Sequence, residues 1–167
     1  MGATVTPILE GTRPLLVEIQ ALVSRSNYSM PQRVVTGVDY QRLVMLLAVL
    51  EKKHGMRLGT QDVFVNVAGG IRVEEPAADL GIVTAIVSSY RDRPADPEAV
   101  IIGEVGLGGE VRAISNPQRR IKEAQKLGFR RCIISAGNLS HMAKEDSLEI
   151  VGVKTVREAL DRLLAAK

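Results

Sequence analysis

The sequence predicts a single α+β domain, in which a mixed β-sheet packs against helices. Short strand patterns alternate with four helical patterns along the chain, an order typical of this class. The length of 167 residues suffices for one domain with its own core, and no repeat or low-complexity segment divides it. The core must be aliphatic, because aromatic residues make up 3% of the chain and Trp is absent.

The N-terminal third predicts a hairpin, a short strand and a helix. Alternating residues 4–9 and 15–23 flank a Gly-Pro turn, so Arg13 lies at the tip of the hairpin, and 34–38 forms the next strand. Asp39 suits the N-cap of a helix that ends at Gly55.

The middle of the chain predicts a buried helix. A strand over 63–68 runs into a glycine pair, and a helix opens at Ala77, just after Pro76. This helix, to Tyr90, is apolar on nearly every side, which indicates burial. Asp79 is expected to stabilise its N-terminus.

The C-terminal part predicts a second hairpin, two strands and two helices. Strands over 100–107 and 110–114 should flank Gly108-Gly109, with Arg112 just past the tip. Asn116 is expected to cap a helix with Pro117 in its first position and a stop at Gly128. Strands over 131–136 and 150–153 precede a last helix, which Thr155 caps and which runs to the C-terminus.

The cysteine content and the hydropathy of the chain bear on its cellular compartment. The single cysteine, Cys132, excludes an internal disulfide and a cysteine-based zinc site within this chain, and favours a reducing compartment. No signal peptide and no uncharged apolar run of about 18 residues is visible, so we expect a cytoplasmic protein without a membrane partner.

The charge is unevenly distributed along the chain. The net charge of +3 arises from +3 over residues 1–60, −6 over 61–110 and +6 over 111–167. Two basic segments around an acidic middle predict one face for a polyanion and another turned elsewhere. The scarcity of aromatic residues argues against stacking of single-stranded bases.

Three motifs in order carry a resemblance to a known family. They are Glu-Pro-Ala-Ala-Asp-Leu-Gly (75–81), Gly-Glu-Val-Gly-Leu-Gly-Gly-Glu-Val-Arg (103–112) and Asn-Pro-Gln-Arg-Arg-Ile-Lys-Glu-Ala (116–124). The chain resembles the proteolytic domain of Lon proteases and, more closely, the Lon-protease-like C-terminal domain of the bacterial RadA (Sms) family, of which segment 10–23 is typical. The resemblance implies a ribosomal-protein-like β-α-β fold, with residues 1–167 forming one domain of a longer chain.

The resemblance places the Ser–Lys dyad of Lon proteases on residues that cannot perform its chemistry. The serine position falls on Ala77 and the lysine position on Gln118. An alanine has no nucleophile and a neutral amide is no general base, so we expect no catalytic residue and no peptidase activity. No positioned base is evident for the other hydroxyls and the thiol, at Ser88, Ser89, Ser115 and Cys132.

The resemblance also implies what the rest of such a protein supplies. RadA-family proteins carry a four-cysteine zinc motif and a RecA-like ATPase with a Walker A loop, neither of which is in this sequence. Zn, Mg and ATP are therefore expected only in a missing N-terminal part, and this domain is expected to hold no metal or cofactor. The intact protein is expected to be a DNA-dependent ATPase, a hexameric ring active in homologous recombination and branch migration, with duplex or branched DNA and a recombinase filament as partners.

The expected DNA-binding residues are four arginines. Arg13, Arg33, Arg42 and Arg112 lie at hairpin tips, a strand start and the first turn of a helix, and could converge on the phosphates of a duplex without reading its sequence. Each could equally be an ordinary solvated side chain. A denser basic group is explained as an exposed helix face: Arg119, Arg120, Lys122 and Lys126.

Two other functions remain open. The domain could be an oligomerisation scaffold without DNA contact, in which the charge asymmetry serves only subunit contacts. In the expected ring, acidic positions between Asp62 and Glu110 would pair with basic ones on a neighbouring copy, which charge reversal at Glu74 and Glu75 would test. The domain could also be an active Lon-type peptidase, which Ala77 and Gln118 argue against.

Overall fold

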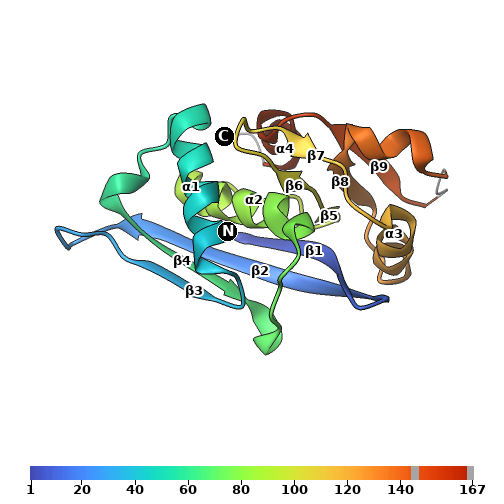
Figure 1. Cartoon of the computed structure of the whole chain (residues 1–167), viewed down its shortest axis with the longest axis horizontal. Coiled ribbons are helices and arrows are strands. Elements are labelled where there is room, and N and C mark those ends of the chain that lie inside the picture. The colour runs from blue at the N-terminus through green and yellow to red at the C-terminus, as the bar shows by residue number, and fades with distance from the viewer. Residues whose placement is uncertain (144–146, 165–167) are drawn as a thin grey trace.

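The computed structural model describes residues 1–143 and 147–164 as one α+β unit (Figure 1). Over these residues the strands are β1 (Ala3–Glu10), β2 (Arg13–Arg25), β3 (Arg33–Thr36), β4 (Gln61–Val67), β5 (Ala99–Ile101), β6 (Glu104–Val105), β7 (Val111–Arg112), β8 (Arg131–Ser135) and β9 (Glu149–Val153). The α-helices are α1 (Tyr40–His54), α2 (Asp79–Arg91), α3 (Pro117–Lys126) and α4 (Val156–Leu163).

The main sheet is mixed, as the sequence predicts. Its strand order is β3-β4-β2-β1-β5-β8-β9, with β6 and β7 in a separate small hairpin. The pairs β1–β2 and β2–β4 are antiparallel, and the remaining neighbours in the sheet run parallel. Figure 1 shows α1 and α2 on one side of the β1–β4 half.

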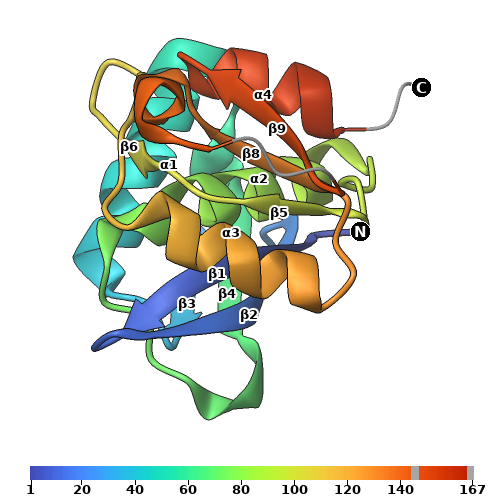
Figure 2. The ribbon, with the colours of Figure 1, turned by 90° about the vertical axis from the view of Figure 1, so that its right-hand side faces the viewer.

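Helices cover the β5–β8 part of the sheet on both faces. Ile101 and Ile133 belong to the core cluster that α1, α2 and α4 also build, whereas Val100 and Cys132 face a second cluster with Ile121 of α3. Helix α3 lies nearest the viewer in Figure 2, in front of this part of the sheet. A strand that is buried on both faces needs apolar residues at successive positions, which explains the apolar runs in β5 and β8.

The sheet is open on one face at its other end. Leu22, Phe64 and Val34 lie side by side in one row across β2, β4 and β3. Leu22 is 59% exposed and Val34 47% exposed. One adjacent row is uncharged, with Asn66 donating a hydrogen bond to Gln20, and the row on the other side contains Ser24 and Asp62. We call Leu22, Phe64 and Val34 the apolar row.

The predicted caps of two helices are confirmed. Asp39 accepts a hydrogen bond from the backbone N–H of Arg42, and Gly55 ends α1 in the left-handed conformation with φ 64°. The side chain of Thr155 accepts from the N–H of Glu158 at the start of α4. The described part of α4 ends at Leu163, and the expected continuation over 165–167 lies outside the described residues.

The predicted helix over Ala77–Tyr90 begins differently. A 3-10 turn over Pro76–Ala78 precedes α2, so Ala77 lies in that turn rather than at the first α-helical position. The burial prediction is confirmed, because every residue from Asp79 to Ser88 is buried. Gly81 allows the close approach to β1, since an added Cβ would collide with Thr6 Oγ1.

Two predictions for the C-terminal part are wrong in detail. The strand over 100–107 divides at Ile102-Gly103, because Ile102 N–H bonds to Ile133 in the main sheet while Glu104 and Val105 turn away to pair with β7. Asn116 makes no side-chain cap; it adopts the left-handed conformation at φ 50° before α3. No helix of the described chain is long and apolar enough to cross a membrane.

Candidate functional site

The turn before α2 packs against α3. Ala77 is 6% exposed and shares an apolar cluster with Ile121 and Ala124 of α3. Its carbonyl accepts a hydrogen bond from the N–H of Gly103 at 2.9 Å. Gln118 is half-buried one turn before Ile121, on the same helix. The two positions that the resemblance assigns to a catalytic dyad thus lie on elements that contact each other.

A buried ion pair stands beside this turn. Arg120 is 1% exposed, and its guanidinium pairs with both carboxylate oxygens of Glu75, one at 3.0 Å. Arg120 also donates to the carbonyls of Ser115 and Pro7, and Glu75 accepts from the N–H of Leu9. The interpretation of Arg120 as part of an exposed basic face is therefore wrong, because its side chain joins α3 to β1 and to the segment before α2.

A second ion pair holds the start of α2. Arg42 donates from Nε to Asp79 at 2.9 Å, forms a second contact from Nη2, and bonds to the carbonyl of Val105. Burial raises the pKa of the Asp79 carboxyl, and the bonds from Arg42 and the Val105 N–H oppose that rise. The hydrogen bond to Asp79 raises the pKa of Arg42. Asp79 thus anchors α1 and β6 as well as its own helix.

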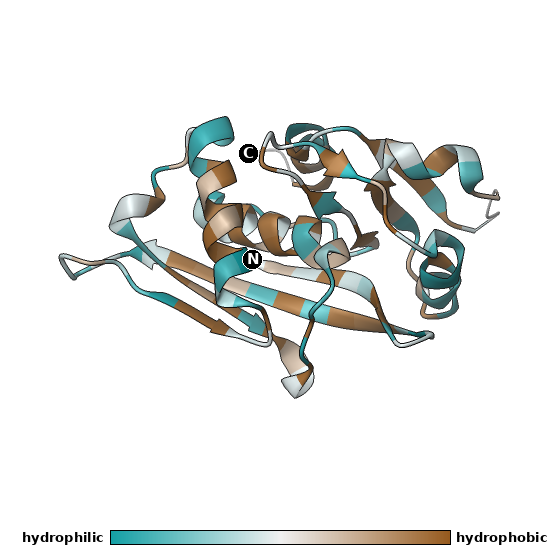
Figure 3. Ribbon diagram, viewed as in Figure 1, coloured by the Kyte–Doolittle hydropathy of each residue, from teal (hydrophilic) through white to brown (hydrophobic). Residues whose placement is uncertain are grey.

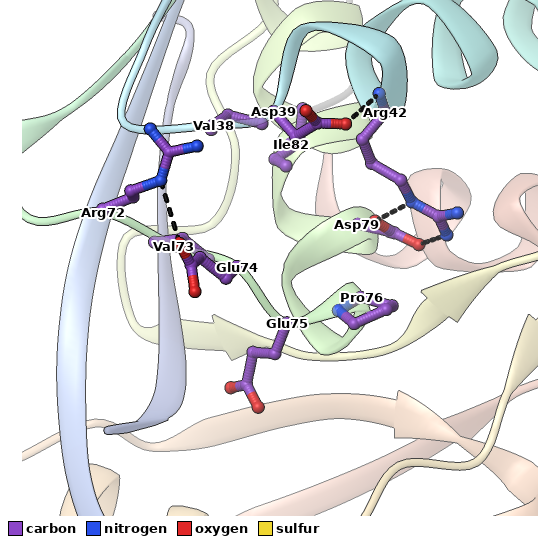
Figure 4. A pocket seen from close by; sticks show the side chains of 10 residues that line it. All are labelled: Val38, Asp39, Arg42, Arg72, Val73, Glu74, Glu75, Pro76, Asp79 and Ile82. Carbon is purple, nitrogen blue, oxygen red and sulfur yellow. Dashed lines mark hydrogen bonds and ion pairs between the residues drawn. The ribbon is translucent and has the colours of Figure 1, made fainter. Parts of the chain in front are cut away.

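These residues border a pocket of about 300 Å³ between α1, the start of α2 and the extended segment before it (Figure 4). Arg42 pairs there with Asp79, and Arg72 with Glu74. In Figure 4, the guanidinium of each arginine points at the carboxylate of its own partner. Few charged groups in this pocket therefore remain for a ligand.

The structure does not bring the four predicted arginines together. In the strand register, Arg33 of β3 and Val23 of β2 lie on either side of the same residue of β4, Val63, so Arg33 is level with the end of β2 that contains Val23. Arg13 is ten residues away along β2, about 33 Å at the rise of a strand. Arg33 also points inward and donates to the carbonyls of Leu58 and Gln61.

Arg42 and Arg112 lie closer to each other, but among acidic residues. Glu104 lies opposite Arg112 in the β6–β7 pair and also acts electrostatically on Arg42. Arg112 is exposed and pairs with Glu110 at 3.1 Å.

The uneven charge along the sequence is largely neutralised within the fold. Eight ion pairs are present in the described part of the chain, and five of them join the acidic middle segment to a flanking basic one. Besides the pairs above, these include Arg131 with Asp96 and Arg130 with Glu98. The acidic segment therefore supplies the counter-charges for part of both basic segments within the fold.

Three basic residues of α3 form no ion pair with another residue that the structure describes. Arg119, Lys122 and Lys126 are exposed, and Arg119 donates to the carbonyl of Thr12 at 3.1 Å, which brings α3 against the tip of the β1–β2 hairpin. Arg13 follows Thr12 and is exposed as well. On sequence alone, this group is interpreted only as an exposed helix face. The positions of Lys122 and Lys126, three and seven residues after Arg119, indicate that the three cations share one side of the helix.

The other hydroxyls and the thiol serve the fold. Ser88 accepts from Gly2 N–H and Ser89 from Val23 N–H. Burial raises the pKa of the Cys132 thiol to about 12, which keeps it protonated and unreactive. In residues 1–143 and 147–164 no three His, Cys, Asp or Glu side chains gather as a metal site requires.

Comparison with known proteins adds the family. The family model for subunit ChlI of Mg-chelatase matches residues 41–138. DNA repair protein RadA of Halalkalibacterium halodurans is 51% identical over 160 residues, which are 96% of this chain and 35% of that protein. The proteins of the same name from Bacillus subtilis (52%, over 95% of this chain and 35% of the relative) and Escherichia coli (51%, over 95% and 34%) are equally similar. The chain spans about a third of the length of these relatives. On these matches, the chain belongs to the family of the ChlI model and is a RadA-like domain.

Proposed function

We propose that this RadA-like domain serves in DNA repair as the Lon-protease-like, C-terminal part of a RadA-type protein, where it binds DNA through phosphates and supports ring assembly. The observation that carries the proposal is the identity of about half the residues, over nearly the whole chain, with proteins named for DNA repair. The basic residues left after internal pairing supply the attraction for phosphates.

The domain is proposed to have lost peptidase activity. Ala77 has no hydroxyl, and α3 presents Gln118 where the resemblance expects a lysine. Incubation of the chain with unfolded casein, without ATP, should leave the casein intact. Cleavage that stops on mutation of a hydroxyl residue would favour the alternative of an active Lon-type peptidase.

DNA binding is proposed to be independent of sequence and sensitive to salt, because phosphate contacts release counterions. Fluorescence anisotropy of a labelled duplex, titrated with the chain from 50 to 200 mM salt, tests this proposal. Arg13→Ala removes an exposed cation that forms no ion pair with another described residue, whereas Arg112→Ala also removes the partner of Glu110. Arg33→Ala and Arg42→Ala also break internal hydrogen bonds, so their effects need a parallel measurement of unfolding.

The activity of the whole protein is proposed to depend on the part outside this chain. ATP, Mg and Zn would bind there, and the ring, a hexamer by resemblance, would couple ATP hydrolysis to movement on DNA during recombination and branch migration in the cytoplasm, with a recombinase filament as a partner. ATPase activity of a full-length RadA-type protein carrying this domain should rise with added DNA, and removal of the domain should weaken that response.

One observation favours the alternative of an assembly scaffold. Leu22 and Val34 of the apolar row are exposed beside the uncharged pair Gln20 and Asn66, and exposed apolar surface of this kind is typical of a face that another protein copy covers. Sedimentation of the chain and of the Leu22→Ser/Val34→Thr variant tests this function. A mass above that of one chain, lost in the variant while DNA binding stays unchanged, would support the scaffold.

A further inference from the structure

We infer that the phosphates of duplex DNA bind to one defined surface, formed by Arg13, Arg119, Lys122 and Lys126 and called here the α3 basic face. The inference rests on the proposed function and locates its DNA-binding site. It moves that site from the four arginines expected from the sequence to the exposed side of α3 and the neighbouring hairpin tip.

The geometry of α3 places its three cations on one side. Lys122 follows Arg119 by three residues and Lys126 follows Lys122 by four, a spacing that repeats on one helix face. All three are exposed, while Arg120, Ile121 and Ala124 face the core. Figure 3 shows α3 as predominantly hydrophilic.

The hairpin tip extends this face. The hydrogen bond from Arg119 Nη1 to the carbonyl of Thr12 holds the tip against the start of α3. Arg13, the next residue, is thereby fixed near Arg119 although 106 positions separate them in the sequence. A hairpin tip anchored in this way presents its cation in a defined place.

The charges of this face are available to a ligand. None of its four cations forms an ion pair with another described residue, whereas Arg42, Arg112, Arg130 and Arg131 all do. Two carboxylates lie near the face: Glu10 is opposite Arg13 in the β1–β2 register, and Glu123 is half-buried on α3.

The position of the cations on the helix argues against a purely local role. Arg119 lies in the first turn of α3, where the helix dipole disfavours positive charge, and that turn holds no acidic residue. Lys52 and Lys53 form a contrasting pair. They lie in the last turn of α1, where the helix carbonyls account for them.

The dimensions suit a duplex backbone. Seven residues of helix span about 10 Å, which matches about three successive phosphates at 3.4 Å rise per strand. The face contains no aromatic side chain on which unpaired bases could stack, so phosphates rather than bases are the expected ligands.

The test compares two charge-matched variants of the chain, Arg119→Glu/Lys122→Glu and Lys52→Glu/Lys53→Glu. Both change the net charge by −4, so general attraction to DNA falls equally. Affinity for a labelled duplex should fall more than tenfold further in the α3 variant than in the α1 variant. The slope of log K against log salt, about −3.6 for four phosphate contacts in the wild-type chain, should become shallower in the α3 variant. Because Arg119 also holds Thr12, Lys122→Glu alone should show the same direction, with circular dichroism and melting unchanged.

Other results separate this inference from the proposed function. Equal losses in both variants, or full affinity in the α3 variant, would overturn the α3 basic face while DNA binding stands. Binding of a polyglutamate chain as tight as that of the duplex would overturn phosphate as its ligand. Absence of wild-type binding at 50 mM salt would overturn the DNA-binding function and the inference with it.

Discussion

Glu75 joins three parts of the molecule through its two carboxylate oxygens. It accepts hydrogen bonds from Leu9 of β1 and from Arg120 of α3, and lies just before the turn that leads into α2. Arg120 is almost completely buried, so its charge depends on this partner. Glu74, the preceding residue, makes only an exposed ion pair with Arg72.

Removal of the carboxylate from Glu75 should therefore destabilise the fold strongly. We expect Glu75→Gln to lower the free energy of unfolding by about 3 kcal/mol, since it leaves a buried guanidinium without its counter-charge. Glu74→Gln is the matched control and should cost at most about 0.5 kcal/mol. Urea unfolding of both variants measures the difference; similar values would show that the Glu75 pair is no stronger than a surface pair. For the same reason, charge reversal of Glu75 would disturb folding, so a loss of assembly in such a variant would not show that Glu75 contacts a neighbouring copy.

His54 gives the fold a pH dependence of known sign. Burial, and repulsion from Arg157 and Arg91, lower the pKa of His54 in the folded chain below 6.5. The unfolded chain then binds the proton more readily, so the stability linked to this group is present above pH 6.5 and is lost as the pH falls through the folded pKa.

The free energy of unfolding of the wild-type chain should thus fall more between pH 7.5 and 5 than that of His54→Gln. Urea titrations at several pH values test this difference. Identical pH curves for His54→Gln and the wild-type chain would contradict the role of His54.

Adjacent residues show where sequence reasoning stops. Arg119 and Arg120 are identical in type and neighbours in sequence, but one is exposed and the other is 1% exposed. Only the contacts from Glu75 and Pro7, which are distant in the chain, decide which arginine is buried. Composition and spacing cannot supply this information.

At the scale of elements, α2 depends on a glycine that helix propensity alone would disfavour. Gly81 lies against Thr6 and Ile19, and its carbonyl accepts a hydrogen bond from Thr4. Close contact between a helix and a sheet is the reason for the missing side chain here.

We expect Gly81→Ala to destabilise the chain by about 1–2 kcal/mol, because overpacking outweighs the gain of about 1 kcal/mol in helix propensity. The Thr6→Ala background provides the control: there the same substitution should cost less or become stabilising. A double-mutant cycle in thermal or urea unfolding measures this coupling, and additive effects would contradict the contact.

The start of α3 offers a second test at this scale. Asn116 has a left-handed backbone conformation and its side chain makes no capping hydrogen bond. The choice of residue at this position should therefore depend on how well it tolerates a positive φ. Asn116→Gly should leave stability unchanged or raise it, while Asn116→Ser should cost about 1 kcal/mol. An N-cap would give the opposite order, with serine close to asparagine and glycine below both. Unfolding of the two variants decides between them.

The sequence predicted most elements because their signals are local. Caps such as Asp39 and Thr155, the apolar surface of α2 and the alternation in β1 and β2 are fixed by nearby residues. The division of 100–107 between two sheets was not predictable, since the break at Gly103 depends on bonds to Ala77 and Leu80.

At the scale of the whole molecule, ion pairing within the fold neutralises part of the uneven charge of the sequence. The charge blocks of the sequence are brought together by the fold, and the ion pairs with the lowest exposure, Arg120–Glu75 and Arg42–Asp79, are screened weakly by salt. Sites that depend on distant pairing of this kind were beyond sequence reasoning, which placed a DNA-binding role on Arg33 and Arg42 without seeing their internal bonds.

Stability and DNA binding should therefore respond differently to salt. Between 0.1 and 0.5 M NaCl we expect the free energy of unfolding to change by less than about 1 kcal/mol, while duplex affinity falls by orders of magnitude. Urea unfolding and anisotropy under the same conditions test this contrast. A parallel decline of both quantities would mean that exposed ion pairs hold the fold together.

The buried Cys132 gives this chain an internal reporter of opening. As the only thiol in the sequence, buried between β5 and β9 and in one apolar cluster with residues of α3, it can meet a labelling reagent only when the fold opens around it. The labelling rate of the unmodified protein therefore measures how often the apolar cluster around Cys132 opens. A duplex that binds on α3 would slow that rate, which would make its binding visible without any fluorophore.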